Sequence, residues 1–173
     1  MFSYFKSYIF GENSKNLEIS SQSPSKIITR QPKRTNNLIS IHNPTNFYYL
    51  SLILEDDNSW SIHGLWPQYT INKYPKFCKD IEFNIHKLKP IINDLERVWY
   101  SNINTDDQFW KHEYLKHGTC NFNNFTELEY FQTTIKLYLK SLELKLPEQF
   151  YCEDTKKCLI PINNNLDFFI IDN

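Results

Sequence analysis

Small residues are scarce in this sequence. Its 173 residues include three glycines and one valine, and alanine is absent. Two of the glycines, Gly64 and Gly118, directly follow a histidine, and three of the four tryptophans lie in the same two segments. These segments, residues 60–67 (WSIHGLWP) and 109–120 (FWKHEYLKHGTC), are therefore the strongest candidates for a functional site.

The chain also lacks an excess of charge and a long apolar run. Its formal net charge is −1, so no general basic field attracts nucleic acid, and any RNA affinity must come from a local site. No stretch approaches the ~18 apolar residues of a membrane span, and we expect no membrane partner. Residues 2–10 are apolar but interrupted by Lys6, and no small-residue cleavage site follows, so the sequence predicts no clear signal peptide.

The four cysteines contain no CxxC pair and form no recognisable zinc-ligand array. They allow three pairings into two disulfides. The alternative is four free thiols in a reducing compartment, but two bridges, and with them an oxidising compartment, are favoured. The residues are Cys78, Cys120, Cys152 and Cys158.

The chain divides into a lead-in and one domain. Residues 1–45, rich in Ser, Asn, Lys and Pro from residue 11 on, predict a flexible segment. The domain is expected at 46–173, a length that suits a single core. Within it, the apolar run 47–54 predicts a strand closed by a turn, residues 60–63 predict a second short strand, and three short strand-like runs follow at 149–152, 158–162 and 166–171.

Helices are expected between these strands. Apolar residues recur at helical spacing over residues 79–99, with Pro90 dividing the element. Asp106 and Asp107 are candidate N-caps of a helix that runs to about residue 117. Thr126, with Glu129 three residues later, predicts a capping box and a helix whose apolar stripe includes Leu128 and Leu139. Strands and helices are segregated, so we expect an α+β fold with a central antiparallel sheet packed against several helices.

Residues 109–117 gather reactive side chains if they form a helix. Successive residues advance by about 100°, so one face of roughly 160° holds two imidazoles, a carboxylate, an ammonium and two aromatic rings. The alternative is a solvated polar face without a function, and the two aromatic residues on the same face argue against it. The residues on this face are Phe109, Trp110, His112, Glu113, Lys116 and His117.

A zinc site is a more specific alternative interpretation of the histidines at 112 and 117. His112-Glu113 with a second histidine nearby resembles the zincin motif, but His112 and His117 are five residues apart rather than four. Their side chains would diverge by about 140° on a helix, whereas chelation needs both along one line. We therefore expect no metal and no other cofactor.

His63 is expected to end the second strand, where Gly64 permits an unusual turn and Pro67 fixes the exit. Alone, such a histidine is more often structural, but beside a helix with two further histidines it becomes a candidate for acid–base catalysis. RNA cleavage needs such a set: a base for the 2′-OH, an acid for the departing 5′-oxygen, and a cation near the phosphorane. Imidazoles suit both proton transfers at mildly acidic pH.

The two segments together resemble the paired active-site signatures of the ribonuclease T2 family, also called acid or S-like ribonucleases. Tyr114 stands where that family frequently has tryptophan, and Tyr49-Leu50-Ser51-Leu52 replaces a common glutamine-tryptophan element. The region after the helix that begins at Thr126 is also shorter than usual. The resemblance implies a ribonuclease T2-like fold with a shortened C-terminal region.

The resemblance also implies roles for single residues. His63 is expected to act as general acid and His117 as general base, with Glu113 and Lys116 stabilising the charged transition state. His112 is expected to bind phosphate, while Trp66 and Phe109 stack on bases. The family's core disulfide matches Cys78–Cys120, and Cys152–Cys158 resembles a second bridge.

The expected function is metal-independent cleavage of single-stranded RNA, first to a 2′,3′-cyclic phosphate and then to a 3′-phosphate. DNA is not expected as a substrate, since the nucleophile is the 2′-OH. The alternative is a non-catalytic RNA-binding or signalling protein of the same fold. We expect a monomer in a secreted or secretory/lysosomal compartment, on the grounds of the disulfides and the family.

Overall fold

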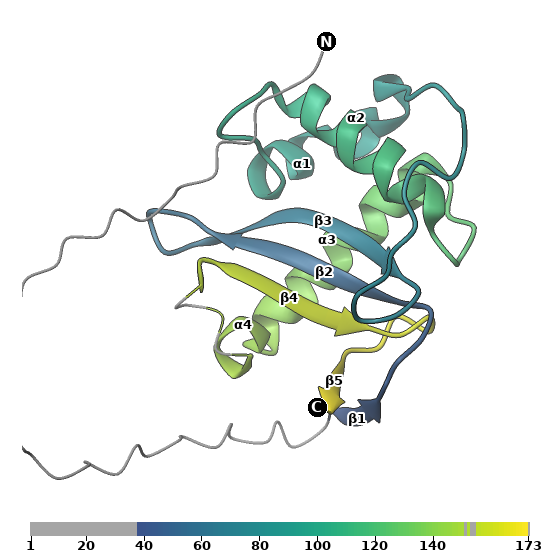
Figure 1. Ribbon diagram of the computed structural model, residues 1–173. Helices are drawn as coiled ribbons and strands as arrows, with labels where there is room; N and C mark the ends of the chain where they lie inside the picture. The colour runs from purple at the N-terminus through teal and green to yellow at the C-terminus, as the bar shows by residue number, and fades with distance from the viewer. Residues whose placement is uncertain (1–37, 151, 153–154, 173) are drawn as a thin grey trace, which may run out of the picture. The chain divides into compact units, whose positions relative to one another are not determined.

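The computed structural model describes residues 38–150, 152 and 155–172. Its centre is an antiparallel sheet in the order β3-β2-β4, formed by β2 (Phe47–Leu54), β3 (Trp60–Gln68) and β4 (Lys157–Ile162) (Figure 1). A separate parallel pair joins β1 (Ile39–His42) to β5 (Phe169–Asp172). The expected α+β class and the strand at 47–54 are confirmed.

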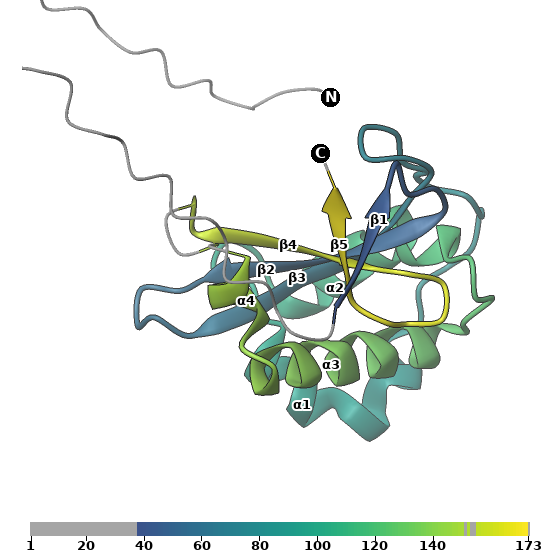
Figure 2. The same ribbon diagram turned by 90° about the horizontal axis from the view of Figure 1, so that it is seen from below.

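Alternation along the strands gives the sheet one apolar face. That face is fully buried, and Figure 2 shows α3 (Glu127–Glu143) lying along the sheet below it. Because each buried aliphatic side chain contributes about 1.5–3 kcal/mol, this layer is the main source of stability. Its residues include Leu50, Leu52, Ile62, Leu65 and Ile160.

The helical segment expected at 79–99 is shorter than its apolar pattern. It begins as a 3₁₀ helix, η1 (Ile85–Ile91), which contains Pro90, and continues as α1 (Ile92–Val98). The proline lacks an amide hydrogen, and regular α-helical bonding starts beyond it. The expected division of the element near Pro90 is confirmed.

Two expectations about the C-terminal half are wrong. The strand expected at 149–152 is replaced by a short helix, α4 (Leu146–Gln149), which Pro147 helps to start. On α3, Leu139 is half exposed rather than part of the apolar stripe. Tyrosines occupy the core side instead, because their hydroxyls can bond backbone carbonyls: Tyr130 donates to Leu65 O at 2.9 Å and Tyr138 to Trp60 O at 2.5 Å.

The folded part begins before the expected boundary at residue 46. Residues 39–42 form β1, because their backbone pairs with β5 near the other end of the chain. Residues 1–37, which make up most of the predicted flexible segment, lie outside the described residues. None of the helices in the described part of the chain is long and apolar enough to cross a membrane.

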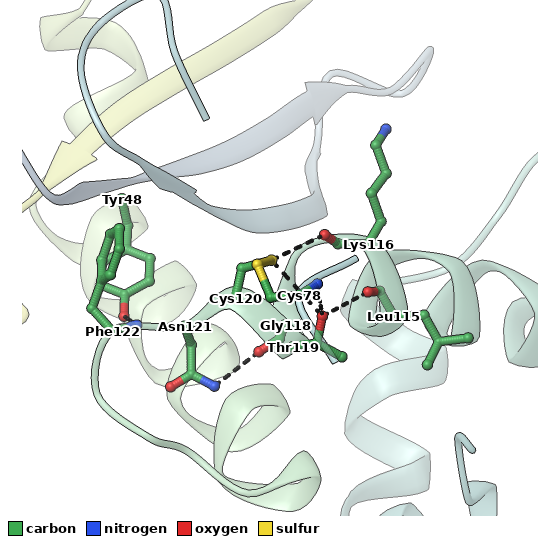
Figure 3. Close-up of a disulfide and its surroundings, with 9 residues drawn as sticks. All are labelled: Tyr48, Cys78, Leu115, Lys116, Gly118, Thr119, Cys120, Asn121 and Phe122. Carbon is green, nitrogen blue, oxygen red and sulfur yellow. Dashed lines mark hydrogen bonds between the residues drawn. A yellow bond between two sulfur atoms is a disulfide. The ribbon is translucent and has the colours of Figure 1, made fainter. Parts of the chain in front are cut away.

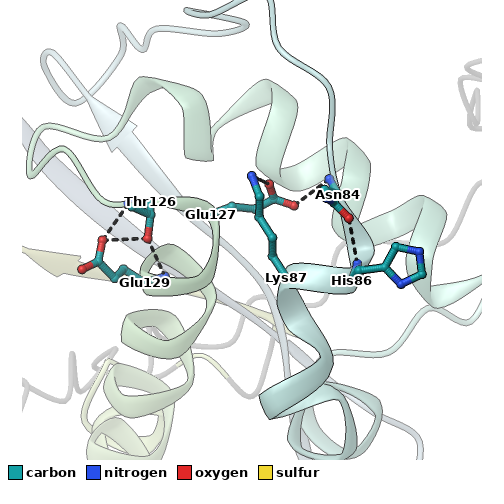
Figure 4. A network of polar contacts seen from close by, with 6 residues as sticks. All are labelled: Asn84, His86, Lys87, Thr126, Glu127 and Glu129. Atoms are coloured by element: carbon teal, nitrogen blue, oxygen red, sulfur yellow. Dashed lines mark hydrogen bonds and ion pairs between the residues drawn. The ribbon is translucent and has the colours of Figure 1, made fainter.

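The N-terminus of α3 is anchored by two polar networks (Figure 4). The expected capping box is present: Glu129 N donates to Thr126 Oγ1, and Thr126 N donates to the Glu129 carboxylate at 2.8 Å. The buried Glu127 carboxylate accepts hydrogen bonds from Asn84 N at 2.9 Å and Lys87 Nζ at 3.2 Å. Glu127 therefore fixes η1 against the start of α3.

The N-cap at Thr126 should make a measurable contribution to the free energy of unfolding. We expect Thr126→Ala to reduce the free energy of unfolding by about 1 kcal/mol, since it leaves the Glu129 amide without its capping acceptor. The measurement is urea unfolding monitored by tryptophan fluorescence. Thr133→Ala, inside the same helix, is the matched control and should be neutral or slightly stabilising. Equal losses in the two variants would contradict the capping role.

Candidate active site at the bulge of β3

His63 occupies a β-bulge. Ser51 pairs with Gly64 and Leu52 pairs with Ile62, so His63 is an extra residue without a partner on β2. A bulge bends its strand and redirects the side chain. We expected the strand to end at His63, but it continues to Gln68. In addition, no glycine among the described residues has a positive φ. The predicted turn at Gly64 is therefore wrong.

Gly64 has a different role, which is to admit another side chain. A Cβ at this position would overlap Glu113 Oε2 and lie 2.5 Å from Trp66 Nε1. The Glu113 carboxylate thus sits directly against the backbone of β3. Glycine is required here by close approach rather than by backbone conformation.

Glu113 comes from α2 (Asp106–Lys116), which lies along the β3 edge of the sheet (Figure 1). The expected helix is confirmed, although its N-cap is Thr105, and Asp106 and Asp107 occupy its first turn. The expected functional face needs one correction. Trp110 belongs to the core, where its Nε1 donates to Trp99 O at 2.6 Å. The helix lies between the core and the candidate site, so this residue points away from the site.

Trp66 connects the predicted site residues. Its Nε1 donates a 2.8 Å hydrogen bond to Glu113 Oε2. Its ring stacks on His117, with centroids 5.2 Å apart and planes at 27°, and meets His63 edge-on at 5.1 Å. His63 Nε2 lies 3.7 Å from Glu113 Oε1, and the ring of Phe109 lies 5.5 Å from that of His63. Both imidazoles therefore contact the same indole, and His63 also lies beside the Glu113 carboxylate.

The C-terminal end of α2 is tethered to the loop that contains Phe77 and Cys78 (Figure 3). Cys78 is bonded to Cys120, Cys78 N donates to Thr119 Oγ1 at 3.1 Å, and Phe77 N donates to Lys116 O at 2.9 Å. Cys152 and Cys158 form the second bridge, so both disulfides implied by the resemblance are confirmed. The first bridge holds the turn that carries Lys116 and His117.

Burial controls the protonation of the site. It raises the pKa of Glu113 from its ordinary value of 4.5 to about 7, against the opposing effects of the Trp66 hydrogen bond and of Lys116. It lowers the pKa of His63 to about 4 and that of His117 to about 3, and Lys116 contributes to both shifts. The pKa of His112 is lowered by partial burial and by Lys116. Between about pH 4 and pH 7 the site therefore favours neutral His63 and His117 imidazoles together with a protonated Glu113.

Several polar atoms of the site have no hydrogen-bond partner among the described residues. They are Nδ1 of His63, Nδ1 of His117 and Oγ of Ser51, which lies opposite Gly64. A buried polar atom without a partner costs stability, and such atoms often mark a place where a ligand or water binds. Within the described ranges, no group of three or more His, Cys, Asp or Glu side chains is arranged to hold a metal.

The sequence profile of the Ribonuclease T2 family matches residues 42–149. The chain belongs to this family. Among curated relatives, ribonuclease DdI of Dictyostelium discoideum is 37% identical over 86 residues, which span 49% of this chain and 39% of DdI. Intracellular ribonuclease LX of Solanum lycopersicum is 38% identical over 89 residues, or 49% of this chain and 37% of LX. The chain thus matches less than half the length of these relatives.

Solved T2-type ribonucleases share the fold. Ribonuclease MC1 from bitter gourd seeds superposes with a TM-score of 0.60 at 18% identity, covering 74% of this chain and 94% of MC1. RNase NT in complex with 5′-AMP gives a TM-score of 0.59 at 22% identity, covering 75% of this chain and 91% of RNase NT. The α+β core is therefore the T2 fold.

Two residues near this T2-type site were missed from the sequence. The ring of Tyr74 lies 6.2 Å from that of His117, and Lys157 Nζ lies over the Trp66 ring, 4.7 Å from its centroid. Tyr74 comes from the loop after β3 and Lys157 from the distant β4. The two motifs do not include either residue, and only the fold brings Lys157 to Trp66.

The raised pKa of Glu113 predicts a pH-dependent stability. Between pH 4.5 and 7 the folded state keeps a proton that the unfolded state has lost, so Glu113 makes the protein less stable as pH rises through this window. Glu113→Gln removes that effect. We expect the variant to gain stability relative to wild type by up to about 1.4 kcal/mol per pH unit across the window.

Urea unfolding at half-unit steps from pH 4 to 8 measures this difference. The opposing contribution of the two histidines, which give up protons on folding, cancels when variant and wild type are compared. Glu143→Gln, at an exposed position on α3, is the control for loss of a surface carboxylate. Parallel curves for Glu113→Gln and wild type would show that the carboxyl is not perturbed as described.

Proposed function

We propose that this protein is a metal-independent endoribonuclease that cleaves single-stranded RNA. The observation that carries the proposal is the placement of His63 and His117 around Trp66 and Glu113, on the T2 fold. The product is a 2′,3′-cyclic phosphate, which is then hydrolysed more slowly to a 3′-phosphate. DNA is not a substrate, because it lacks the 2′-OH nucleophile.

His117 serves as the base in the first step. Its lowered pKa keeps the imidazole neutral and able to take the 2′-OH proton. His63 serves as the acid for the 5′-oxygen and must carry a proton. A bound phosphate offsets the positive charges that lower the pKa of His63, so substrate binding favours the required state.

Glu113 and Lys116 stabilise the phosphorane, in which negative charge develops on the non-bridging oxygens. A protonated Glu113 donates a hydrogen bond there, and Lys116 supplies positive charge. His112, exposed one turn before Lys116, adds a phosphate contact. The raised pKa of Glu113 supports this assignment, since a carboxylate would repel the developing charge.

Aromatic rings bind the bases. Phe109 is half-buried beside His63 and offers a face to the nucleotide on that side. Trp66 is the second stacking candidate, although its ring already packs on His117. RNase NT is solved in complex with 5′-AMP, which supports the proposal that this chain also binds nucleotides. We further propose a monomer in an oxidising, secretory compartment, in keeping with the two disulfides.

The activity is tested with purified protein and single-stranded RNA across pH 4–8, with EDTA present. We expect cleavage with 2′,3′-cyclic phosphate ends, strongest on the acidic side, where His63 is more readily protonated. DNA of the same sequence should remain intact. Absence of cleavage over the whole range would reject the enzyme in favour of a non-catalytic RNA-binding protein, and cleavage that EDTA abolishes would reject metal independence.

The roles of the two histidines are tested by substitution. His63→Phe and His117→Phe should each lower kcat/KM by about 10²–10⁴-fold, because each removes one proton-transfer group. His86→Phe, which changes an exposed histidine away from the site, is the control and should cleave at the wild-type rate. If either active-site variant retains more than about a tenth of the activity, the wrong residue has been assigned.

A further inference from the structure

Lys157 is a second cation at the site, on a different element from Lys116. It opens β4 and pairs with Ile53 of β2, while its neighbour Cys158 is bonded to Cys152. The ladder and the disulfide therefore fix the backbone from which the side chain extends. Its ammonium reaches Trp66, 4.7 Å from the ring centroid, and is held there by a cation–π contact.

Lys157 lies near His63, because its ammonium covers the same indole that the His63 ring meets edge-on. After burial, its charge is the largest cause of the lowered pKa of His63, ahead of Lys116. The charges that lower the pKa of His117 are instead those of Lys116, His112 and His63. His117 also stacks on Trp66, so the indole contacts both imidazoles and the Lys157 ammonium. The charge of Lys116 acts on both imidazoles, whereas Lys157 is among the charges that act on His63.

The ammonium of Lys157 is also available to a ligand. The residue is exposed and makes no ion pair with any residue that the structure describes. The adjacent Lys156 differs, because its Nζ lies 3.5 Å from Asp56 Oδ1. The charge of Lys157 lowers the pKa of the Glu113 carboxyl, but burial has the larger effect, and Glu113 holds its proton up to about pH 7. Among the described residues, Lys157 is therefore a cation without an ion-pair partner.

We propose that Lys157 binds the phosphate next after the cleaved one, on the 3′ side of the scissile bond. This rests on the proposed function, in which His63 protonates the departing 5′-oxygen. The leaving nucleoside then lies on the His63 side of the site, and the next anion along the RNA strand is the phosphate on its 3′-oxygen. Lys157 is an exposed cation near His63, and its contact with Trp66 places the ammonium there before RNA binds.

The test compares two substrates that differ only in that phosphate. They are the dinucleotides NpA and NpAp, with each of the four bases in turn at N. Wild type should favour NpAp in kcat/KM, and Lys157→Met should reduce the NpAp/NpA ratio roughly fivefold, the effect of one solvent-screened ionic contact. Lys157→Arg should keep the preference. Because the ratio is taken within each variant, a general change in His63 acidity cancels.

Lys156→Met is the matched control, since it removes the same charge from the adjacent position and should leave the ratio at the wild-type value. The proposal is overturned if wild type shows no preference for NpAp, or if Lys157→Met keeps the wild-type ratio. An equal loss on both substrates also overturns it, because Lys157 would then tune the site without contacting that phosphate.

A binding measurement separates this inference from the proposed activity. Dissociation constants are measured for the 2′-deoxy analogues of NpA and NpAp, which cannot be cleaved. Wild type should bind the NpAp analogue more tightly, and its log Kd should depend more steeply on log salt concentration than that of Lys157→Met, because wild type makes one more ionic contact with the phosphate. If wild type cleaves no RNA, the proposed function fails, and equal slopes in this measurement would reject the role of Lys157 independently.

Discussion

The site depends on the contact between a carboxylate of α2 and the backbone of β3. Glu113 lies against Gly64, where no other residue would leave room, and accepts a hydrogen bond from Trp66 two residues later. This contact sets how α2 approaches the sheet edge. It thereby also sets where His117, one turn further along the helix, meets the indole. A larger residue at position 64 would displace the Glu113 carboxylate and the Trp66 indole from this contact.

The apolar core holds this contact in place despite its cost. The buried carboxyl has a raised pKa, and two imidazoles have no partner at Nδ1 among the residues that the structure describes; each of these features lowers the stability of the folded state. Fully buried aromatic residues on the other side of α2 and β3 offset this. Trp99 bridges the two regions, because its Nε1 donates to His63 O at 3.0 Å, and its own carbonyl accepts from Trp110. The bulged backbone of β3 is thus supported from the core.

Features carried by neighbouring residues could be predicted from the sequence, whereas features created by pairing could not. The strand at 47–54, the helix ending near residue 117 and the capping box at Thr126 each follow from a local pattern, and all three are confirmed. The bulge at His63 is a property of the register between β2 and β3. The sequence of β3 alone does not show this register, and it therefore suggested that the strand ends at His63. Lys157 is brought to Trp66 only by the order β3-β2-β4, and no spacing along the chain indicates it.

The low net charge of the chain is compatible with binding a polyanion, because the charges that matter are local. The charges of Lys116 and Lys157 both act on Glu113 and His63, and the Glu113 carboxyl has a pKa of about 7, so it is neutral over much of the acidic range. Burial thus removes one negative charge from the site without removing a residue. As pH falls, Glu113 is protonated first and His63 next, while His117 stays neutral to the lowest pH of the three, and this order suits the proposed roles of His63 as acid and His117 as base.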